Sequence, residues 1–303
     1  ILGYSKMHTG VDFALYKPTT IHRRIARRLV LSKRHTLLDY AAFLMGNNAE
    51  LDALYDDVLI NVTSFFRNEG TFDLLERTIL PELLRQRGEE SLRFWVVGCS
   101  TGQEPYSIAM AFLEAADAAQ HMRKLQIFAT DLNDAVIEKA RIGLYSKSAV
   151  ADVSESRLQR FFVEADGGYR INKCVRDMVL FARQNLIEDP PFSRIDLISC
   201  RNLLIYLEPS AQKKVMPTFH YALNPGGFLI LGASESVGGS TDLFRVVDGK
   251  HKIYAKKPVK STVRPFLTRK KRVAVLEEGS LSTPELPAEA SPLGSPLASP
   301  SPS

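Results

Sequence analysis

The hydrophobic and polar positions of the chain follow two different periods, and the change lies near residue 90. Before it, apolar residues recur every three or four positions, which is typical of amphipathic helices. The spacing predicts four helices, beginning near Pro18, Thr36, Asn48 and Glu69. We expect Thr19 or Thr20 to cap the first helix and Gly88 to stop the last. The first 88 residues are therefore predicted to form a small helical domain.

After residue 90, short apolar runs alternate with helical patterns. The runs predict strands at 92–97, 125–129, 178–181, 195–199 and 228–231, with helices at 105–118, 133–141 and 210–222. Pro105 is expected to open the first of these helices, and Asn224-Pro-Gly-Gly227 to end the last. Strands alternating with helices predict an α/β fold with a doubly wound, mostly parallel sheet. Asp248-Gly249 predicts a final hairpin and thus an antiparallel edge.

Two stretches depart from this alternation. Residues 146–176 combine a short helical pattern near Ser154 with Asp166-Gly-Gly168 before Tyr169, which predicts a small β-subdomain inserted into an α/β domain of residues 89–257. From Pro258 onward the chain holds 8 of its 16 prolines and ends in Ser-Pro repeats. Such a composition does not bury enough apolar surface to offset backbone entropy. Residues 258–303 are therefore predicted to be a disordered linker.

Composition and charge exclude several classes of protein and indicate the charge of a partner. The 303 residues are 45% apolar and 24% charged, which excludes a fibre or a wholly disordered chain. No run is apolar enough to span a membrane and no signal peptide is visible, so we expect a cytoplasmic protein without membrane insertion. The three cysteines have no metal-ligand spacing, and no metal site is expected. Residues 1–35 carry a net charge of +7 in a chain of +5, which favours an acidic partner. The start without Met predicts a piece of a longer polypeptide.

The chemistry is expected at the carboxyl ends of the strands, where open α/β sheets bind ligands. The first strand is followed by Gly98-Cys-Ser-Thr-Gly-Gln-Glu-Pro-Tyr-Ser107, whose glycines let the backbone approach a ligand. This loop has neither the Gly-x-Gly-x-x-Gly pattern nor the Lys-Ser/Thr of a phosphate-binding loop, so a nucleoside without phosphates is favoured. Asp131 ends the second strand, where it could bind ribose hydroxyls or, alternatively, cap the next helix before Asn133.

Two further clusters stand at junctions of the predicted elements. Asn61-Val-Thr-Ser-Phe-Phe-Arg67 joins the helical domain to the rest, and Cys200-Arg-Asn-Leu-Leu-Ile-Tyr206 follows the fourth strand. Each has a simpler interpretation, because paired phenylalanines can form an interdomain core and most charged side chains merely face water. Together at strand ends, the two clusters favour a binding site.

These motifs resemble those of the chemotaxis receptor methyltransferases of the CheR type, which use S-adenosylmethionine to esterify glutamates of chemoreceptors. The resemblance runs from Gly10 to Lys256. Besides the segments above, it includes Ala129-Thr-Asp131, Asn185-Leu186, Pro225-Gly-Gly227 and Gly232-Ala-Ser-Glu235. The family more often has Glu at Gln103 and His at Ala233, and neither difference removes a group that the chemistry needs.

The resemblance implies a fold and a set of functional residues. It implies an N-terminal helical domain, a methyltransferase sheet with the inserted subdomain, and S-adenosylhomocysteine as product. The residues implied to bind the cofactor are Asn61, Thr63, Arg67, Gly98, Glu104, Asp131, Asn185, Leu186, Arg201 and Asn202. Arg67 and Tyr206 are implied to be catalytic and to lie beside the methyl acceptor. The basic helix with Arg23, Arg24, Arg27 and Arg28 is implied to face the acidic, methylated helices of the partner.

Two function classes remain open from the sequence. The chain is either an active protein-glutamate O-methyltransferase or a weak or inactive cofactor-binding scaffold, fused to a methylesterase domain and sensory domains. A glutamate carboxylate, with an ordinary pKa of about 4.3, is ionised at neutral pH and needs no general base. The scattered histidines are consistent with that chemistry. A nucleic-acid partner is disfavoured, because the basic segment lacks interleaved aromatic residues.

Overall fold

The structure, a computed structural model, describes residues 1–86 and 90–260. The helical pattern before residue 90 forms the elements α1 (Leu2–Thr9), the 3-10 helix η1 (Phe13–Leu15), α2 (Pro18–Leu31), α3 (Leu37–Leu44), α4 (Asn48–Val58), α5 (Glu69–Leu74), the π-helical η2 (Leu75–Ile79) and α6 (Leu80–Gln86). The four predicted helices are present, and α1 is an addition that the periodicity does not show. The predicted stop at Gly88 lies outside the described residues.

The predicted cap of α2 is wrong. Thr19 and Thr20 lie inside the helix, because Pro18 is its first residue and Lys17 precedes it without a side-chain cap. Proline fixes a helical φ and has no N–H to satisfy, so it starts a helix without help from a hydroxyl. Asp39 N–H and Glu50 N–H do bond to side-chain caps, Thr36 of α3 and Asn47 of α4.

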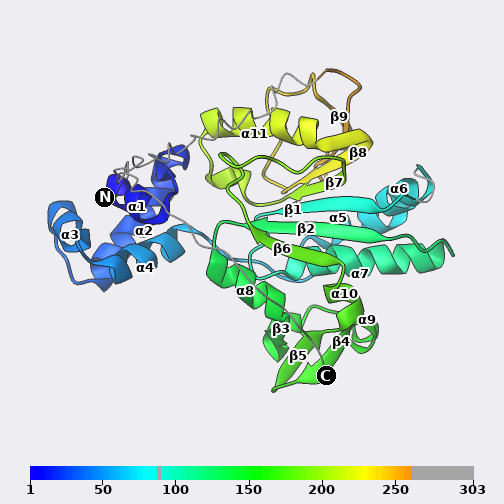
Figure 1. The fold of residues 1–303 in the computed structure, drawn as a ribbon, viewed down its shortest axis with the longest axis horizontal. Helices are drawn as coiled ribbons and strands as arrows, with labels where there is room; N and C mark the ends of the chain where they lie inside the picture. Colours follow the sequence, from blue (N-terminus) through cyan, green and yellow to red (C-terminus); the bar gives the residue numbers. More distant parts are fainter. Residues whose placement is uncertain (87–89, 261–303) are drawn as a thin grey trace, which may run out of the picture. The chain divides into compact units, whose positions relative to one another are not determined.

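The alternating pattern after residue 90 forms a seven-stranded sheet (Figure 1). Its strands, in spatial order, are β6 (Val179–Arg183), β2 (Leu125–Asp131), β1 (Leu92–Val97), β7 (Ile195–Cys200), β8 (Leu223–Leu231), β10 (Ile253–Lys256) and β9 (Phe244–Asp248). The five strands from β6 to β8 are parallel, and β10 and β9 pair antiparallel at the edge. The strand order reverses between β1 and β7, which confirms the doubly wound fold class.

Helices cover both faces of the sheet (Figure 1). On one face, Phe94 and Val96 of β1 join a buried cluster with α6, α7 (Gln103–Ala118) and α8 (Asp134–Ile142). On the other face, Trp95 packs edge-on against Phe219 of α11 (Pro209–Ala222), with ring centroids 5.7 Å apart. The alternation of neighbouring residues between two apolar faces explains why the central strands have continuous apolar runs. Helices α5 and α6 pack with the sheet rather than with α1 to α4.

A second, three-stranded antiparallel sheet lies where the sequence interrupts the alternation. It has the order β3 (Leu144–Ser146), β5 (Gly168–Ile171), β4 (Phe162–Ala165). The short elements η3 (Lys147–Val150), α9 (Glu155–Phe161) and α10 (Lys173–Arg176) accompany it, and η4 (Leu204–Tyr206) follows β7. The turn between β4 and β5 is Asp166-Gly167, both with positive φ. The domain boundaries at residues 88 and 257 stay a prediction, and the predicted linker lies outside the described residues beyond residue 260.

Three local expectations need correction. Pro105 is the third residue of α7, which begins at Gln103 after Gly102. Asn224 to Gly227 lie within β8, because α11 ends at Ala222 and the chain enters the sheet at once with an irregular register against β7. The Asp248-Gly249 hairpin is present, but four residues connect its strands, Gly249 to Lys252. Among the described residues, no helix is both long and apolar enough to cross a bilayer.

Candidate functional site

A cavity opens at the carboxyl ends of the central parallel strands, beside the point where the strand order reverses. It is open to solvent at its mouth, and a concave site at this position of an α/β sheet is a usual place for a small-molecule ligand. All eleven residues that the sequence places at the cofactor or the acceptor line it, namely Asn61, Thr63, Arg67, Gly98, Glu104, Asp131, Asn185, Leu186, Arg201, Asn202 and Tyr206. The lining also includes residues without a predicted role, such as Tyr16, Ser100, Gln184 and Leu203.

The loop after β1 brings the backbone close to the cavity. Gly98 and Gly102 have φ of +69° and +93°, a left-handed region that side chains with a Cβ rarely adopt. A Cβ at Gly102 would lie 2.9 Å from the Cβ of Ala140, so the loop also needs glycine for its packing on α8. The loop thereby leads from the end of β1 into α7 within five residues.

Asp131 ends β2 and is held by backbone donors from two loops. Its Oδ2 accepts a hydrogen bond from Ser100 N–H at 2.8 Å, and its Oδ1 accepts one from Asn133 N–H at 3.1 Å. Burial raises the pKa of Asp131, and the backbone hydrogen bonds act against that shift. The cap of α8 is Asn133, whose side chain accepts from Ala135 N–H and Val136 N–H. Asp131 therefore fixes the loop and keeps acceptor capacity toward the cavity.

Glu104 and Arg201 form a buried ion pair on the floor of the site. Arg201 Nη1 lies 3.1 Å from Glu104 Oε2, and the two side chains are only 3% and 13% exposed. Ser199 Oγ donates to the other carboxylate oxygen at 2.6 Å. Arg201 Nη2 in turn donates to the carbonyl of Arg67 and to Asn68 Oδ1, at 2.5 and 2.8 Å. The pair therefore ties the helix after β1 to the segment that carries Arg67.

Arg67 and Tyr206 lie on the lining where the resemblance places the methyl acceptor. Arg67 Nη1 donates to the carbonyl of Val62 at 3.0 Å, and no acidic side chain within the described residues pairs with it. Tyr206 ends η4, and its carbonyl accepts from Lys17 N–H at 2.8 Å, directly before α2. A guanidinium and a phenol are thus available for an anion that enters the cavity.

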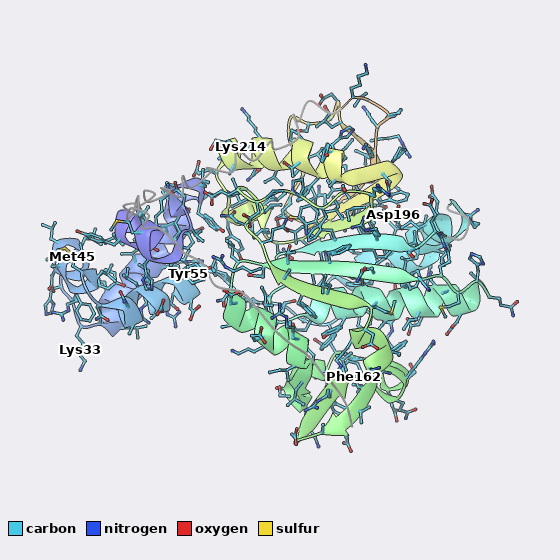
Figure 2. The ribbon with its side chains drawn as sticks, viewed as in Figure 1. Lys33, Met45, Tyr55, Phe162, Asp196 and Lys214 are labelled. Carbon is cyan, nitrogen blue, oxygen red and sulfur yellow. The ribbon has the colours of Figure 1, made fainter. Side chains whose placement is uncertain are left out.

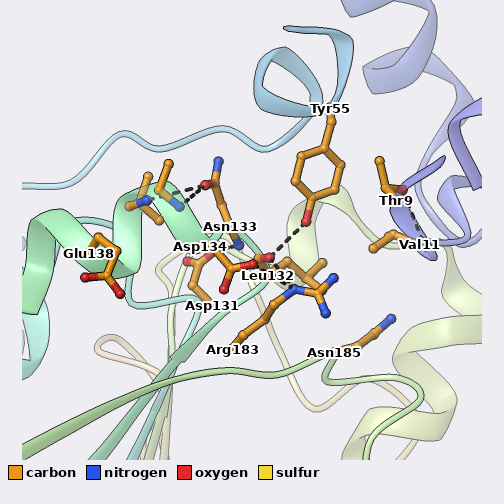
Figure 3. Close-up of polar contacts among 12 residues, drawn as sticks. Thr9, Val11, Tyr55, Asp131, Leu132, Asn133, Asp134, Glu138, Arg183 and Asn185 are labelled. Carbon is orange, nitrogen blue, oxygen red and sulfur yellow. Dashed lines mark hydrogen bonds and ion pairs between the residues drawn. The ribbon is translucent and has the colours of Figure 1, made fainter. Parts of the chain in front are cut away.

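The N-terminal helices complete the wall of the cavity. Tyr55 of α4 donates its hydroxyl to the carbonyl of Leu132 at 2.8 Å, and Arg183 Nε donates to the same oxygen at 3.2 Å (Figure 3). Asn133 Nδ2 also donates to Asp56 Oδ1 of α4 at 2.9 Å. These bonds fix α4 over the loop that follows β2, and with it the segment containing Asn61 and Thr63.

Glu235 is a residue of the site that the sequence leaves without a role. It is 5% exposed, and its carboxylate accepts from the N–H groups of Asn202, Ile205 and Gly232 at 3.0, 3.2 and 2.6 Å. Burial raises its pKa, while these backbone bonds lower it. Glu235 therefore fixes the loop that presents Asn202 and Tyr206. The motif Gly232-Ala-Ser-Glu235, which is part of the resemblance, is the signal that could have shown it.

The four arginines implied to face a partner do not share one environment. Arg23 is exposed and Arg24 is half-buried, and no acidic partner is recorded for either among the described residues. Arg27 is 55% exposed and pairs with Asp57 at 2.5 Å. Arg28, by contrast, binds both carboxylate oxygens of the buried Glu50, at 3.0 and 2.6 Å. Arg28 therefore supports the packing of α2 on α4, and its implied contact with a partner stays a prediction.

The fold and the site define a class of protein: an open α/β sheet that binds a nucleoside-type cofactor at its switch point, without a phosphate-binding loop. Comparison with known families identifies the member of that class. Residues 1–59 match the all-alpha domain of the CheR methyltransferases, and residues 61–253 match the SAM-binding domain of the same family. The chain belongs to the CheR methyltransferase family, and its cofactor is S-adenosylmethionine.

Individual relatives agree with this assignment. The chain is 37% identical over 238 residues to the chemotaxis protein methyltransferase of Listeria monocytogenes, covering 78% of this chain and 88% of that protein. It is 32% identical over 249 residues to chemotaxis protein methyltransferase 2 of Vibrio cholerae, with coverages of 80% and 86%. A 104.1 kDa protein from the hypE 3′ region of Rhodobacter capsulatus is 41% identical over 245 residues. That match covers 80% of this chain and 26% of the relative.

Proposed function

We propose that this protein transfers a methyl group from S-adenosylmethionine to glutamate carboxylates of chemoreceptors or related signalling proteins. One observation carries the proposal: residues from distant segments converge on one cavity, whose lining includes the carboxylate of Asp131 for a nucleoside and both Arg67 and Tyr206 for an anionic acceptor. The names of the relatives, chemotaxis protein methyltransferases, support the same class of substrate.

The residues of the cavity fit the cofactor. Asp131 offers carboxylate lone pairs to ribose hydroxyls, and Val97, Leu132, Leu186 and Leu203 offer apolar surface to an adenine ring. S-adenosylmethionine supplies an electrophilic methyl group, and the sulfur keeps the electron pair of the broken S–C bond when the new O–C bond forms.

The task of the protein in this reaction is alignment rather than proton transfer. The glutamate acceptor is already an anion at neutral pH, so the absence of a base among Arg67 and Tyr206 is no obstacle. These two groups would hold the carboxylate by charge-assisted and hydroxyl hydrogen bonds, so that one oxygen points along the line of attack. They must not bind too tightly, because the negative charge is neutralised in the transition state.

Labelled methyl transfer tests the proposal. The cofactor labelled in its methyl group is incubated with receptor-containing membranes, and radioactivity that is released by base identifies a glutamyl ester. Calorimetry with S-adenosylhomocysteine runs in parallel on the same protein. Binding together with base-labile label supports the enzyme; binding without label under any receptor preparation supports the scaffold alternative and overturns catalysis. The predicted fusion to further signalling domains stays a prediction.

A further inference from the structure

The outer face of α2 carries a stripe that changes from basic to apolar along the helix. Ile21 and Ile25 are buried against the helices beneath, which leaves Arg23, Ala26, Arg27 and Val30 exposed at the spacing i, i+3, i+4, i+7. Those four residues share one face of an α-helix. The stripe begins with cations and ends at Val30, which is 72% exposed.

The apolar end of this stripe continues onto α3. Leu38 and Met45 of this region are 85% and 58% exposed, and Leu31 and Leu37 are 56% and 59% exposed. A surface helix normally turns polar residues outward, but α3 has Asp39 as its sole charged residue and is apolar on its outer side too. We name the surface of Val30, Leu31, Leu37, Leu38 and Met45 the apolar tip. Large apolar side chains exposed together near the end of α2 and on α3 favour an interaction site.

The stripe connects the cavity to the apolar tip. Lys17, the residue before α2, donates its N–H to the carbonyl of Tyr206 at 2.8 Å, and Tyr16 lines the cavity. The helix of 14 residues then runs about 20 Å at 1.5 Å per residue. In Figure 2, Tyr55 lies on the side of the helices that faces the sheet, whereas Lys33 and Met45 lie on the opposite side. Val30 and Leu31, the part of the apolar tip that lies on α2, are therefore about 20 Å along the helix from the residue that binds the Tyr206 carbonyl.

We propose that the apolar tip is a second docking site for the methylated helix of the substrate protein. It receives an apolar residue that lies about 14 residues, or two heptads, from the acceptor glutamate on the same face of that helix. The acidic positions between them pass over Arg23 and Arg27. The inference rests on the proposed function, because it takes the occupant of the cavity to be a glutamate of a helical protein.

Charge and continuity favour this occupant over others. Helix α2 has no acidic residue, and although Arg27 and Arg28 pair with Asp57 and Glu50 of α4, Arg23 and Arg24 keep its face positive, which suits a negatively charged partner. A second copy of this chain would bring another basic α2 against the first, which is unfavourable. A glutamate in the cavity is covalently continuous with the next turns of its own helix, and these turns reach the α2 stripe without a separate binding event.

The experiment uses designed two-stranded coiled coils as methyl acceptors. Each carries one glutamate on its outer face within an acidic stripe, and either Leu or Ser two heptads away on the same face. A third carries the Leu one heptad away. The wild-type protein is expected to methylate the two-heptad Leu substrate with a KM about tenfold below that of the Ser substrate, with kcat little changed. The enzyme variant V30S/L38S should lose that preference, whereas the control V163S/L180S, which removes a valine and a leucine that are 58% and 50% exposed elsewhere, should keep it.

Other results would overturn the inference. Equal KM values for the Leu and Ser substrates, or a preference for the one-heptad spacing, would exclude docking of an apolar residue two heptads from the acceptor glutamate. Two further results would also exclude it. These are a dimer of the wild-type protein in sedimentation, or its binding to phosphatidylglycerol vesicles, if V30S/L38S abolished that association while the KM for the acceptors stayed the same. Failure of the proposed function looks different, since then neither the coiled coils nor receptor-containing membranes acquire label. If only the membranes are labelled, V30S/L38S must raise their KM relative to V163S/L180S, or the inference is wrong.

Discussion

On the sheet side of the cavity the polar side chains are bonded to the chain itself, whereas on the side of α2 several are not. Glu104, Arg201 and Asp131 all have partners within 3.1 Å and little exposure. Arg23 and Arg67 have no acidic partner among the described residues, and the apolar tip has no cover. The cofactor is the same in every turnover, so side chains that are already held in place bind it more tightly. The entropy cost of ordering them is met during folding and not during binding.

The other side has the opposite requirement. An acceptor protein must arrive, be modified and leave, so groups committed to internal partners would have to be freed at each turnover. Exposed cations increase the rate of encounter with an acidic surface, and their effect is reduced by salt. The comparison predicts that substitutions on the sheet side affect stability and cofactor binding, and that substitutions on the α2 side affect the KM of the acceptor.

The largest effect is expected for Arg201→Ala. The substitution leaves Glu104 as an unpaired, buried charge and removes the bonds to the Arg67 carbonyl and Asn68. Breaking a buried pair in this way costs about 3–5 kcal/mol in the free energy of unfolding. Urea denaturation measures it, and Arg27→Ala, which removes an exposed pair, is the control at about 0.5 kcal/mol or less. Equal losses in the two variants would contradict the contrast between the two sides.

Asp131→Asn should come next. An amide presents one acceptor in place of two, so the affinity for S-adenosylhomocysteine is expected to fall about 10- to 100-fold, with Asp134→Asn unchanged as the exposed neighbour. Burial raises the pKa of Asp131, and the ionised form is the better acceptor. The wild-type affinity should therefore fall as the pH drops through that raised pKa, while the variant stays flat. Calorimetry from pH 8 downward measures both, and a parallel decline in the two proteins would exclude Asp131.

The sheet and its site residues were predictable from the sequence for a physical reason. A central parallel strand is buried on both faces and must be apolar throughout, so polar residues appear abruptly at its end, as at Asp131 and Arg201. Helix α1 was not predictable, because Leu2 to Thr9 has almost no amphipathic period. Arg28 looked like a surface cation because a single segment cannot show that Glu50, 22 residues later, returns to pair with it.

Hydrogen bonds between residues far apart in the sequence were the other feature that could not be predicted. Ser199 and Glu235 act on Glu104 and on the loop of Asn202 through bonds that span 95 and 33 residues. Sequence motifs indicate the side chains that approach a ligand, because those side chains lie close together in the sequence at the ends of strands. Residues that only hold such side chains in place have no spacing rule, and the structure is required to find them.

Glu235→Gln tests such a positioning residue and should have an intermediate effect. Gln can accept at one oxygen, and its amide group would face an N–H of Asn202, Gly232 or Ile205. We expect kcat to fall about tenfold as Tyr206 moves, equivalent to ~1.4 kcal/mol, with a smaller change in affinity for S-adenosylhomocysteine. Glu208→Gln is the control on the same loop, because that side chain is not among these bonds. A change confined to thermal stability, with kcat intact, would make Glu235 purely structural.

The smallest effect is expected for Arg23 and Arg24, the arginines of α2 without an acidic partner among the described residues. The double substitution R23E/R24E reverses charge on α2 without breaking an ion pair recorded in the described chain, so the free energy of unfolding and the affinity for S-adenosylhomocysteine should stay constant. The KM for an acidic acceptor should rise about three- to tenfold at low ionic strength, and the difference should shrink in 0.5 M salt because these charges are screened. Arg28→Ala is the matched comparison on the same helix. It should lower stability through the loss of its bond to Glu50 and leave the salt dependence of KM unchanged. If R23E/R24E instead abolished cofactor binding, α2 would belong to the fixed side of the cavity and the contrast between the two sides would fail.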